Sequence, residues 1–175
     1  MKKVEQNFNF INMEHDVMKF WEDEKCFQAL LEKNKDGKKF RFLDGPITAN
    51  NPMGIHHAWG RTLKDIYIRY KGMNGYTSHY RNGFDGQGLW IEVEVEKELG
   101  FNDKKDIEKY GLENFTKKCL ARVDHFSKTI TEQSKRLGQW MDWDNSYYTN
   151  TAENITAIWH FLKKCDELGM IERSF

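Results

Sequence analysis

DGPITANNPMGIHHAWG, residues 44–60, is the stretch that decides the fold of this 175-residue chain. A short apolar strand, Lys38–Leu43, precedes it, and the helical pattern that follows begins at two adjacent histidines, His56 and His57. Unpaired N–H groups and a partial positive charge at a helix N-terminus favour an anion, and imidazoles add hydrogen-bond donors. The sequence therefore predicts a strand–loop–helix unit that binds a phosphate group.

The residues that follow predict a parallel arrangement of two strands. A helix is expected from about His57 to Asn74, because apolar residues recur there at three- and four-residue steps. The recurring residues are Trp59, Leu63, Ile66, Tyr70 and Met73. Gly75 ends this helix, and Thr77–Tyr80 forms a second strand. This strand–helix–strand order is typical of a right-handed βαβ unit, so we expect an α/β fold.

A second special loop, Asn82–Gly88 (NGFDGQG), is expected after the second strand. Ligand sites in open α/β sheets gather at the carboxyl ends of strands, where both special loops would lie. We therefore expect the two loops to share one site. Asp85 has two interpretations: a turn residue that bonds its own backbone, or a carboxylate that holds a cationic group of a ligand such as an α-ammonium.

The rest of the chain predicts mostly helices. We expect them over Asn12–Lys33, Leu89–Leu99, Asp106–Tyr110, Glu113–Leu137 and Ala152–Leu168. The segment IEVEVE within the second of these also alternates like a strand, and its glutamates are interpreted as solvated charges. The aromatic stretch Trp140–Tyr148 is expected to be a packed connection. We divide the chain into an N-terminal helical segment, residues 1–38, and an α/β domain with a helix-rich C-terminal part, residues 39–175.

Composition narrows the function classes. The chain has 27 Lys and Arg residues and 27 Asp and Glu residues, so its formal net charge is zero. This charge gives no support to nucleic-acid binding through neutralisation of many phosphates. The three cysteines lack zinc spacing, and we expect no zinc or other metal site in this segment. No secretory signal opens the chain, and no apolar run approaches about 18 residues. A cytoplasmic location with no membrane partner is expected.

Several residues in and after the first loop can be interpreted either as ligand contacts or as structural residues. His57 is interpreted as a phosphate contact, whereas His56 either contacts the nucleotide or packs. Gly54 and Gly60 permit close backbone approach or mark ordinary turns. Lys64 lies on the following helix, where it is expected by default to belong to a solvent-exposed face. The dinucleotide pattern G-x-G-x-x-G and the P-loop pattern are both missing from the sequence, which disfavours those two explanations.

Residues 44–76 closely resemble the first nucleotide-binding segment of the class I aminoacyl-tRNA synthetases of the isoleucine, leucine, valine and methionine group, and the isoleucyl members most of all. NGFDGQGLWIEVEVEKELG, DIEKYGLENFTKKC and RLGQWMDWDNSYYT resemble later motifs of that family, in the same order. The resemblance implies the first half of a Rossmann-like catalytic domain. It also implies ATP with Mg²⁺ as a substrate complex. The other implied partners are a branched aliphatic amino acid, isoleucine before the others, and tRNA.

The family's HIGH tetrad falls on residues 54–57, GIHH in this chain. The resemblance implies catalytic roles for His57 and His56. It assigns ATP binding to Gly54, His57, Gly60 and Lys64, and amino-acid binding to Gly45, Pro46, Asp85 and Gln87. The first histidine of the tetrad is Gly54 here and its glycine is His56. Gln87 likewise stands where the family's second loop has a histidine.

The implied activity is ATP-dependent formation of an aminoacyl-adenylate and transfer of the aminoacyl group to tRNA. Family members are much longer, and no KMSKS-like motif occurs in this chain. We therefore expect an N-terminal fragment that reaches tRNA only through domains outside it and that is weak or inactive alone. The alternatives are a leucyl- or valyl-type fragment, a non-catalytic ATP-binding paralogue, and a decayed fragment whose fold has outlived its function.

Overall fold

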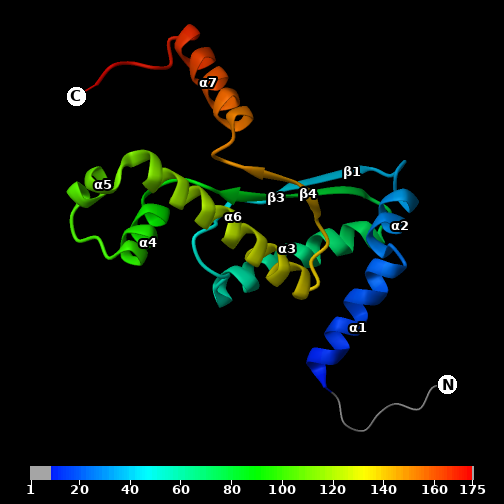
Figure 1. Ribbon diagram of the computed structural model, residues 1–175. Coiled ribbons are helices and arrows are strands. Elements are labelled where there is room, and N and C mark those ends of the chain that lie inside the picture. Colours follow the sequence, from blue (N-terminus) through cyan, green and yellow to red (C-terminus); the bar gives the residue numbers. More distant parts are fainter. Residues whose placement is uncertain (1–8, 175) are drawn as a thin grey trace, which may run out of the picture. The chain divides into compact units, whose positions relative to one another are not determined.

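The structure is a computed structural model that describes residues 9–174 (Figure 1). The helices are α1 (Phe10–Asp23), α2 (Cys26–Lys33), α3 (Ile55–Met73), α4 (Leu89–Leu99), α5 (Lys104–Tyr110), α6 (Leu112–Arg136) and α7 (Ala152–Glu167). The strands are β1 (Lys39–Leu43), β2 (Ile47–Thr48), β3 (Thr77–Asp85) and β4 (Asp142–Tyr148). This content of helices and parallel strands confirms the predicted α/β class.

Two compact units alternate along the chain. Unit 1 contains the described residues up to Leu43, Pro52–Arg81 and Lys128–Trp143. Unit 2 contains Asp44–Asn51, Asn82–Ser127 and the described residues from Asp144 onwards. The expected domain boundary between residues 38 and 39 stays a prediction.

In unit 1, β1 pairs in parallel with the first part of β3, from Lys39 opposite Thr77 to Leu43 opposite Arg81. Parallel neighbours need a crossover connection, and α3 is the helix within it. The predicted βαβ arrangement is therefore confirmed. One cluster of buried and half-buried side chains fills the space between the helix and the strands. Its members are Ile68, Tyr80, Met141, Phe40, Phe42 and Trp143.

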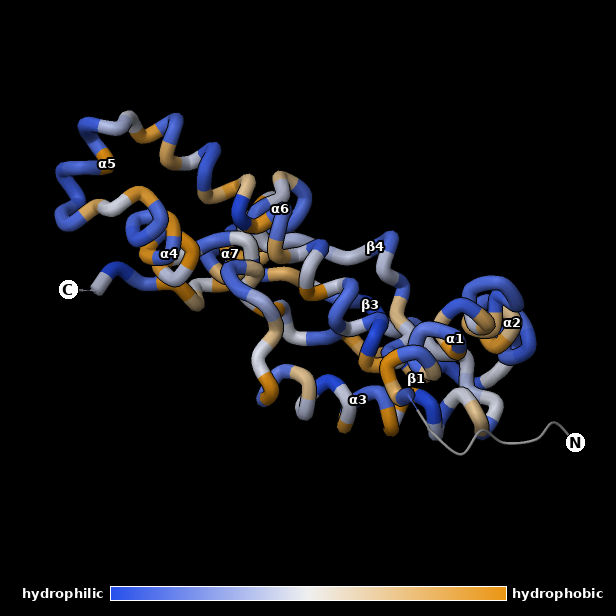
Figure 2. Tube along the Cα trace, turned by 60° about the horizontal axis from the view of Figure 1, so that its bottom comes forward, coloured by the Kyte–Doolittle hydropathy of each residue, from blue (hydrophilic) through white to orange (hydrophobic). Residues whose placement is uncertain are grey.

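The recurring apolar residues that predicted α3 do not form its buried face. They are exposed, Trp59 by 68% and Met73 by 85%. The hydrophobic positions lie along the whole length of α3 (Figure 2). The helix instead buries Arg61, Asp65, Ile68 and Gly72. Hydrogen-bonded partners allow charged side chains to be buried, so the inner face of α3 is more polar than its outer face.

Two shorter helices replace the single helix predicted over Asn12–Lys33. Asn9 caps the first, because its side chain accepts hydrogen bonds from the N–H groups of Ile11 and Asn12. Between α1 and α2, Lys25 adopts the left-handed conformation with φ of 49°. A left-handed residue cannot continue an α-helix, so the chain turns there and begins α2.

In unit 2, Ile47 and Thr48 of β2 lie opposite Phe84 and Asp85 of β3, in parallel. The N–H of Ala49 also donates to the carbonyl of Asp85 at 3.1 Å. Residues 82–85, expected in a loop, are therefore the end of a strand, and only the remainder of that segment is loop. Asn82 is fully buried there, which hydrophobicity patterns do not anticipate.

The aromatic stretch expected to be a connection is partly a strand, because Asp142–Tyr148 forms β4 and pairs with β3. Within unit 2, Tyr148 packs on Phe84 with ring centroids 5.3 Å apart. Within unit 1, Trp140 packs against Trp21 and Phe27. The expectation of packing holds for these aromatic residues, whereas Asp142–Tyr148 is a strand of the sheet and more than a connection.

The helical part of unit 2 agrees closely with its predicted bounds. Helices α4, α5 and α6 enclose a second core of Val95, Ile107 and Phe115. Gly100 ends α4 with a positive φ of 71°, as its position predicts. Helix α7 buries none of its residues. Among the described residues, no helix is both long enough and apolar enough to span a membrane.

Gly83→Ala should destabilise the chain by about 1–3 kcal/mol, the usual cost of overpacking. A Cβ at Gly83 would lie 2.2 Å from the ring of Tyr147, whose hydroxyl donates to the carbonyl of Asp44 at 2.9 Å. Thermal unfolding measures the change. Gly60→Ala is the matched control, because its added Cβ meets nothing within 4 Å and should raise the melting temperature slightly. Equal melting temperatures for the Gly83 variant and the parent chain would contradict this packing.

Candidate functional site

The N-terminus of α3 in unit 1 carries the first group of predicted site residues. Gly54 is the N-cap, and its carbonyl accepts from the N–H groups of His57 and Ala58 at 3.0 and 3.1 Å. The N–H of Gly54 donates to Nδ1 of His57 at 3.3 Å. The rings of His56 and His57 lie against each other, with centroids 3.8 Å apart. Both imidazoles therefore lie in the first turn of the helix, as predicted.

These contacts determine the form of His57 that a ligand would meet. When Nδ1 accepts a hydrogen bond, the neutral ring carries its proton on Nε2, which becomes a donor. Burial lowers the pKa of His57, because it penalises the charged ring, and the positive charges of His56 and Arg61 lower the pKa further. The neutral form of His57 is therefore favoured, and its Nε2–H is a hydrogen-bond donor beside the positive end of a helix.

Helix α6 supplies two contacts to this region of unit 1 that the sequence analysis missed. Oε1 of Gln133 accepts from the N–H of Met53 at 2.7 Å, immediately before the N-cap of α3. Oγ of Ser134 accepts from the buried guanidinium of Arg61 at 3.4 Å. The partners are 80 and 73 residues apart in the chain, so no local pattern signals them. They fix the start of α3 from outside the helix.

Asp85 in unit 2 ends β3 with both carboxylate oxygens engaged. Oδ1 accepts from the hydroxyl of Thr149 at 3.0 Å, and Oδ2 accepts from the hydroxyl of Thr48 at 3.4 Å. The N–H of Gly86 donates to Oγ1 of Thr149 at 3.0 Å. The carboxylate therefore has a fixed orientation, and each oxygen keeps lone pairs for a further donor. No pattern in the sequence distinguishes either threonine.

The other residues predicted to bind the amino acid also lie in unit 2. Gly45 and Pro46 are exposed in the segment between β1 and β2. Gln87 is exposed in the loop after β3, and it lines a half-open cavity of about 270 Å³. The cavity wall also includes Ile91, Glu92, Ile107, Leu112, Phe115 and Cys119.

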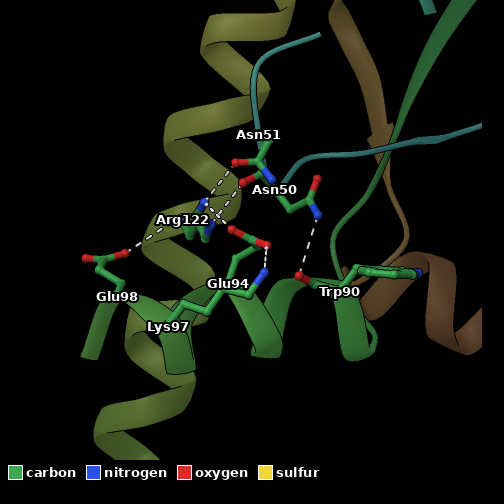
Figure 3. Close-up of polar contacts among 7 residues, drawn as sticks. All are labelled: Asn50, Asn51, Trp90, Glu94, Lys97, Glu98 and Arg122. Carbon is green, nitrogen blue, oxygen red and sulfur yellow. Dashed lines mark hydrogen bonds and ion pairs between the residues drawn. The ribbon is translucent and has the colours of Figure 1, made fainter. Parts of the chain in front are cut away.

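Arg122 of α6 binds the loop after β2 in unit 2 (Figure 3). Its guanidinium donates to the carbonyl of Asn50 at 2.9 Å and to the side-chain oxygen of Asn51 at 3.1 Å. It also pairs with Glu98 at 3.2 Å and lies 3.7 Å from a carboxylate oxygen of Glu94. One half-buried cation thus joins the loop, α4 and α6.

The structure brings together some of the predicted site residues within each unit. Gly54, His56 and His57 form one group, and Gly60 and Lys64 lie further along the same helix. The expectation that the two special loops share one site stays a prediction, as do the individual roles. Within residues 9–174, no cluster of three or more His, Cys, Asp or Glu side chains has the arrangement of a metal site.

Comparison with solved structures identifies the class of fold. The LeuRS–tRNA–LeuAMS ternary complex of Agrobacterium radiobacter K84 agnB2 is similar, with a TM-score of 0.65 over 92% of this chain and 18% of that chain. The sequence identity is 18%, so this likeness concerns the fold alone. The fold is the Rossmann-like α/β fold of the part of that synthetase which this chain matches.

A family model described as tRNA synthetases class I (I, L, M and V) matches residues 16–175. The chain therefore belongs to this family, which confirms the resemblance seen in the sequence. It is 41% identical over 170 residues to the isoleucine–tRNA ligase of Dehalococcoides mccartyi and 43% identical over 162 residues to that of Pyrococcus abyssi.

The chain spans only part of these relatives. The matches cover 97% and 92% of this chain, but 17% and 15% of the two ligases. An isoleucine–tRNA ligase from Haloquadratum walsbyi gives the same picture, with 39% identity over 99% of this chain and 16% of that ligase.

Acidification should destabilise the chain through His57. Because the pKa of His57 is lower in the folded chain than in the unfolded chain, the unfolded state takes up the proton first, and stability falls as the pH drops from about 7 to about 5. The melting temperature of the parent chain should therefore fall more over this interval than that of His57→Gln. His160→Gln on α7 controls for loss of a histidine. Parallel curves for the parent chain and His57→Gln would contradict this linkage.

Arg122→Met should destabilise the chain by about 1–3 kcal/mol, because it removes charge-assisted hydrogen bonds from α6 to the loop after β2 and to Glu98. Amide hydrogen exchange should rise at Asn50 and Asn51 at the same time. Lys117→Met on the same helix is the matched control. Its ion pair with Glu113 is exposed, so its loss should cost less than about 0.5 kcal/mol. Similar costs for the two variants in urea unfolding would rule out a special role for Arg122.

Proposed function

We propose that this chain forms part of the ATP- and amino-acid-binding region of an isoleucine–tRNA ligase. The reaction joins the amino acid to ATP as an aminoacyl-adenylate and then transfers the aminoacyl group to tRNA. The observation that carries the proposal is the first turn of α3, where a neutral His57 is held by Gly54, in a chain of this family. Identities near 40% to isoleucine–tRNA ligases favour isoleucine over leucine or valine.

Unit 1 contributes to phosphate binding in this proposal. A carboxylate oxygen of the amino acid attacks the α-phosphorus of ATP, the bond to the β-phosphate oxygen breaks, and pyrophosphate leaves. Nε2–H of His57 and the free N–H groups of the first turn of α3 donate to phosphate oxygens and stabilise their charge. His56, Gly60 and Lys64 complete the proposed ATP contacts. Mg²⁺ arrives with ATP and neutralises part of the phosphate charge.

Unit 2 contributes to amino-acid binding in this proposal. Asp85 accepts a hydrogen bond from the α-ammonium of the substrate, and the hydroxyls of Thr48 and Thr149 keep the carboxylate in one orientation. Gly45, Pro46 and Gln87 are the proposed pocket residues. Orienting the substrate before the reaction supplies much of the rate enhancement in such a step.

The remaining partners belong to the same proposal. tRNA is the acceptor, bound through regions that the relatives possess and this chain does not cover, and the site of action is the cytoplasm. The alternative activity is ATP binding without chemistry.

ATP titration followed by calorimetry tests the phosphate half of the proposal. The parent chain should bind ATP, and His57→Ala should weaken binding by about tenfold, the effect of losing a hydrogen bond to a charged group. His160→Ala is the control. Equal affinities for the parent chain and His57→Ala would remove His57 from the site.

Pyrophosphate exchange with isoleucine, leucine and valine tests the chemistry. The chain is mixed with the Dehalococcoides ligase from which the matching 170 residues have been removed. Exchange with isoleucine above the other two amino acids supports the proposal. ATP binding without exchange in any mixture supports the non-catalytic alternative.

A further inference from the structure

The two faces of the sheet that β1 and β3 form in unit 1 have opposite character. Phe40, Phe42 and Tyr80 join the apolar cluster on the side of the strands where α3 runs (Figure 1). Successive side chains of a strand point to opposite faces, so the residues next to these aromatics point away from the helix. Those residues are exposed, and they are Lys39, Arg41 and Leu43 of β1 and His79 and Arg81 of β3.

Four of them, Lys39, Arg41, His79 and Arg81, form what we call the basic sheet face. Arg41 lies opposite His79 in the parallel register. Neighbouring strands are about 4.8 Å apart, and alternate residues of one strand are about 6.6 Å apart, so the four side chains are near neighbours. Arg81 interacts within the chain, as does Asp142 at the start of β4. The side chains of Lys39, Arg41 and His79 have no hydrogen bond or ion pair with another residue of 9–174.

Two ordinary explanations do not account for this face. Parallel sheets with helices on both faces have strands that are almost continuously apolar, whereas β1, KFRFL, alternates in exposure. Charges on an edge strand also prevent it from pairing with other chains, and this explanation suits β1. It does not suit β3, which pairs with both β1 and β4 and carries two of the four basic residues.

We propose that the basic sheet face binds the phosphate backbone of RNA. Guanidinium and ammonium groups donate hydrogen bonds to phosphate oxygens, and arginine does so with two parallel N–H groups. A polyanion on this face would also reduce the repulsion between like charges on neighbouring strands. The inference goes beyond the proposed function, because this contact requires neither ATP nor an amino acid.

The composition of the face favours RNA over an acidic protein. Protein–protein interfaces have an apolar and aromatic core, whereas nucleic-acid interfaces are more polar and much more positively charged. Leu43 is the one apolar side chain that β1 and residues 77–81 expose on this face, and it lies at the end of the group, opposite Arg81. Those strand residues offer no aromatic ring on this face for base stacking, so binding should not depend on RNA sequence.

Fluorescence anisotropy with labelled poly(U) RNA tests the proposal. At low salt the parent chain should bind with a Kd of about 10⁻⁶–10⁻⁴ M, the range of non-specific binding. Lys39→Gln/Arg41→Gln should weaken binding about tenfold and reduce the slope of log K against log salt concentration by about 1–2. The matched control Lys105→Gln/Lys118→Gln removes the same charge from exposed helix positions of unit 2, and it should change neither quantity. Equal losses in the two variants would overturn the proposal.

A conservative variant separates charge from strand structure. Arg41→Lys keeps the positive charge and should retain most of the affinity for poly(U), whereas Arg41→Gln should lose it. Thermal unfolding checks that both variants are folded. Equal affinities for these two variants would remove Arg41 from the contact.

Competition and ATP binding distinguish the remaining outcomes. Polyglutamate should displace little of the RNA, and complete displacement at equal charge concentration would assign the face to an acidic protein instead. Lys39→Gln/Arg41→Gln should bind ATP as the parent chain does. A parent chain that binds ATP but not poly(U) would overturn the RNA contact alone. A parent chain that binds poly(U) through this face but not ATP would support the RNA contact and count against the proposed function.

Discussion

The parallel pairing of β1 with β3 is the constraint on which unit 1 depends. Two parallel neighbours cannot be joined by a tight turn, so the chain must leave the end of β1 and return to the start of β3 through a crossover. Most of that crossover is α3, and its N-terminus follows the loop after β1. The helix N-terminus that favours an anion is therefore a consequence of strand pairing, and the two histidines lie in the first turn of that helix.

Hydrophobic periodicity correctly predicted that α3 is a helix, but the apolar residues of that pattern lie on its exposed face and not on its buried face. Such a pattern reports where apolar residues lie, whereas burial also depends on whether polar partners are available. Arg61 reaches Ser134, and Asp65 pairs with Arg69 at 2.5 Å. These partners allow the two charged side chains to be buried on the inner face of α3. In α6, by contrast, the apolar residues Phe115, Val123 and Ile130 are buried.

The site was predictable to the extent that its signals are local. The helix start with His57 follows from motif and resemblance within a few residues. Asp85 was singled out in the same way, although it was expected in a loop and lies at the end of β3. Thr149 and Gln133 were missed because their partners lie 64 and 80 residues away, and nothing in their own surroundings distinguishes them. The break at Lys25 was missed for another reason: lysine has no preference for the left-handed conformation that it adopts there.

The exposed outer face of α3 has a thermodynamic consequence. Side chains such as Trp59, Ile66 and Met73 are largely in contact with water before unfolding as well as after it. They therefore add little to the heat capacity change of unfolding, which arises from newly exposed apolar surface. The stability of the chain should vary with temperature along a flatter curve than its content of large apolar residues suggests, and its resistance to cold should be correspondingly greater.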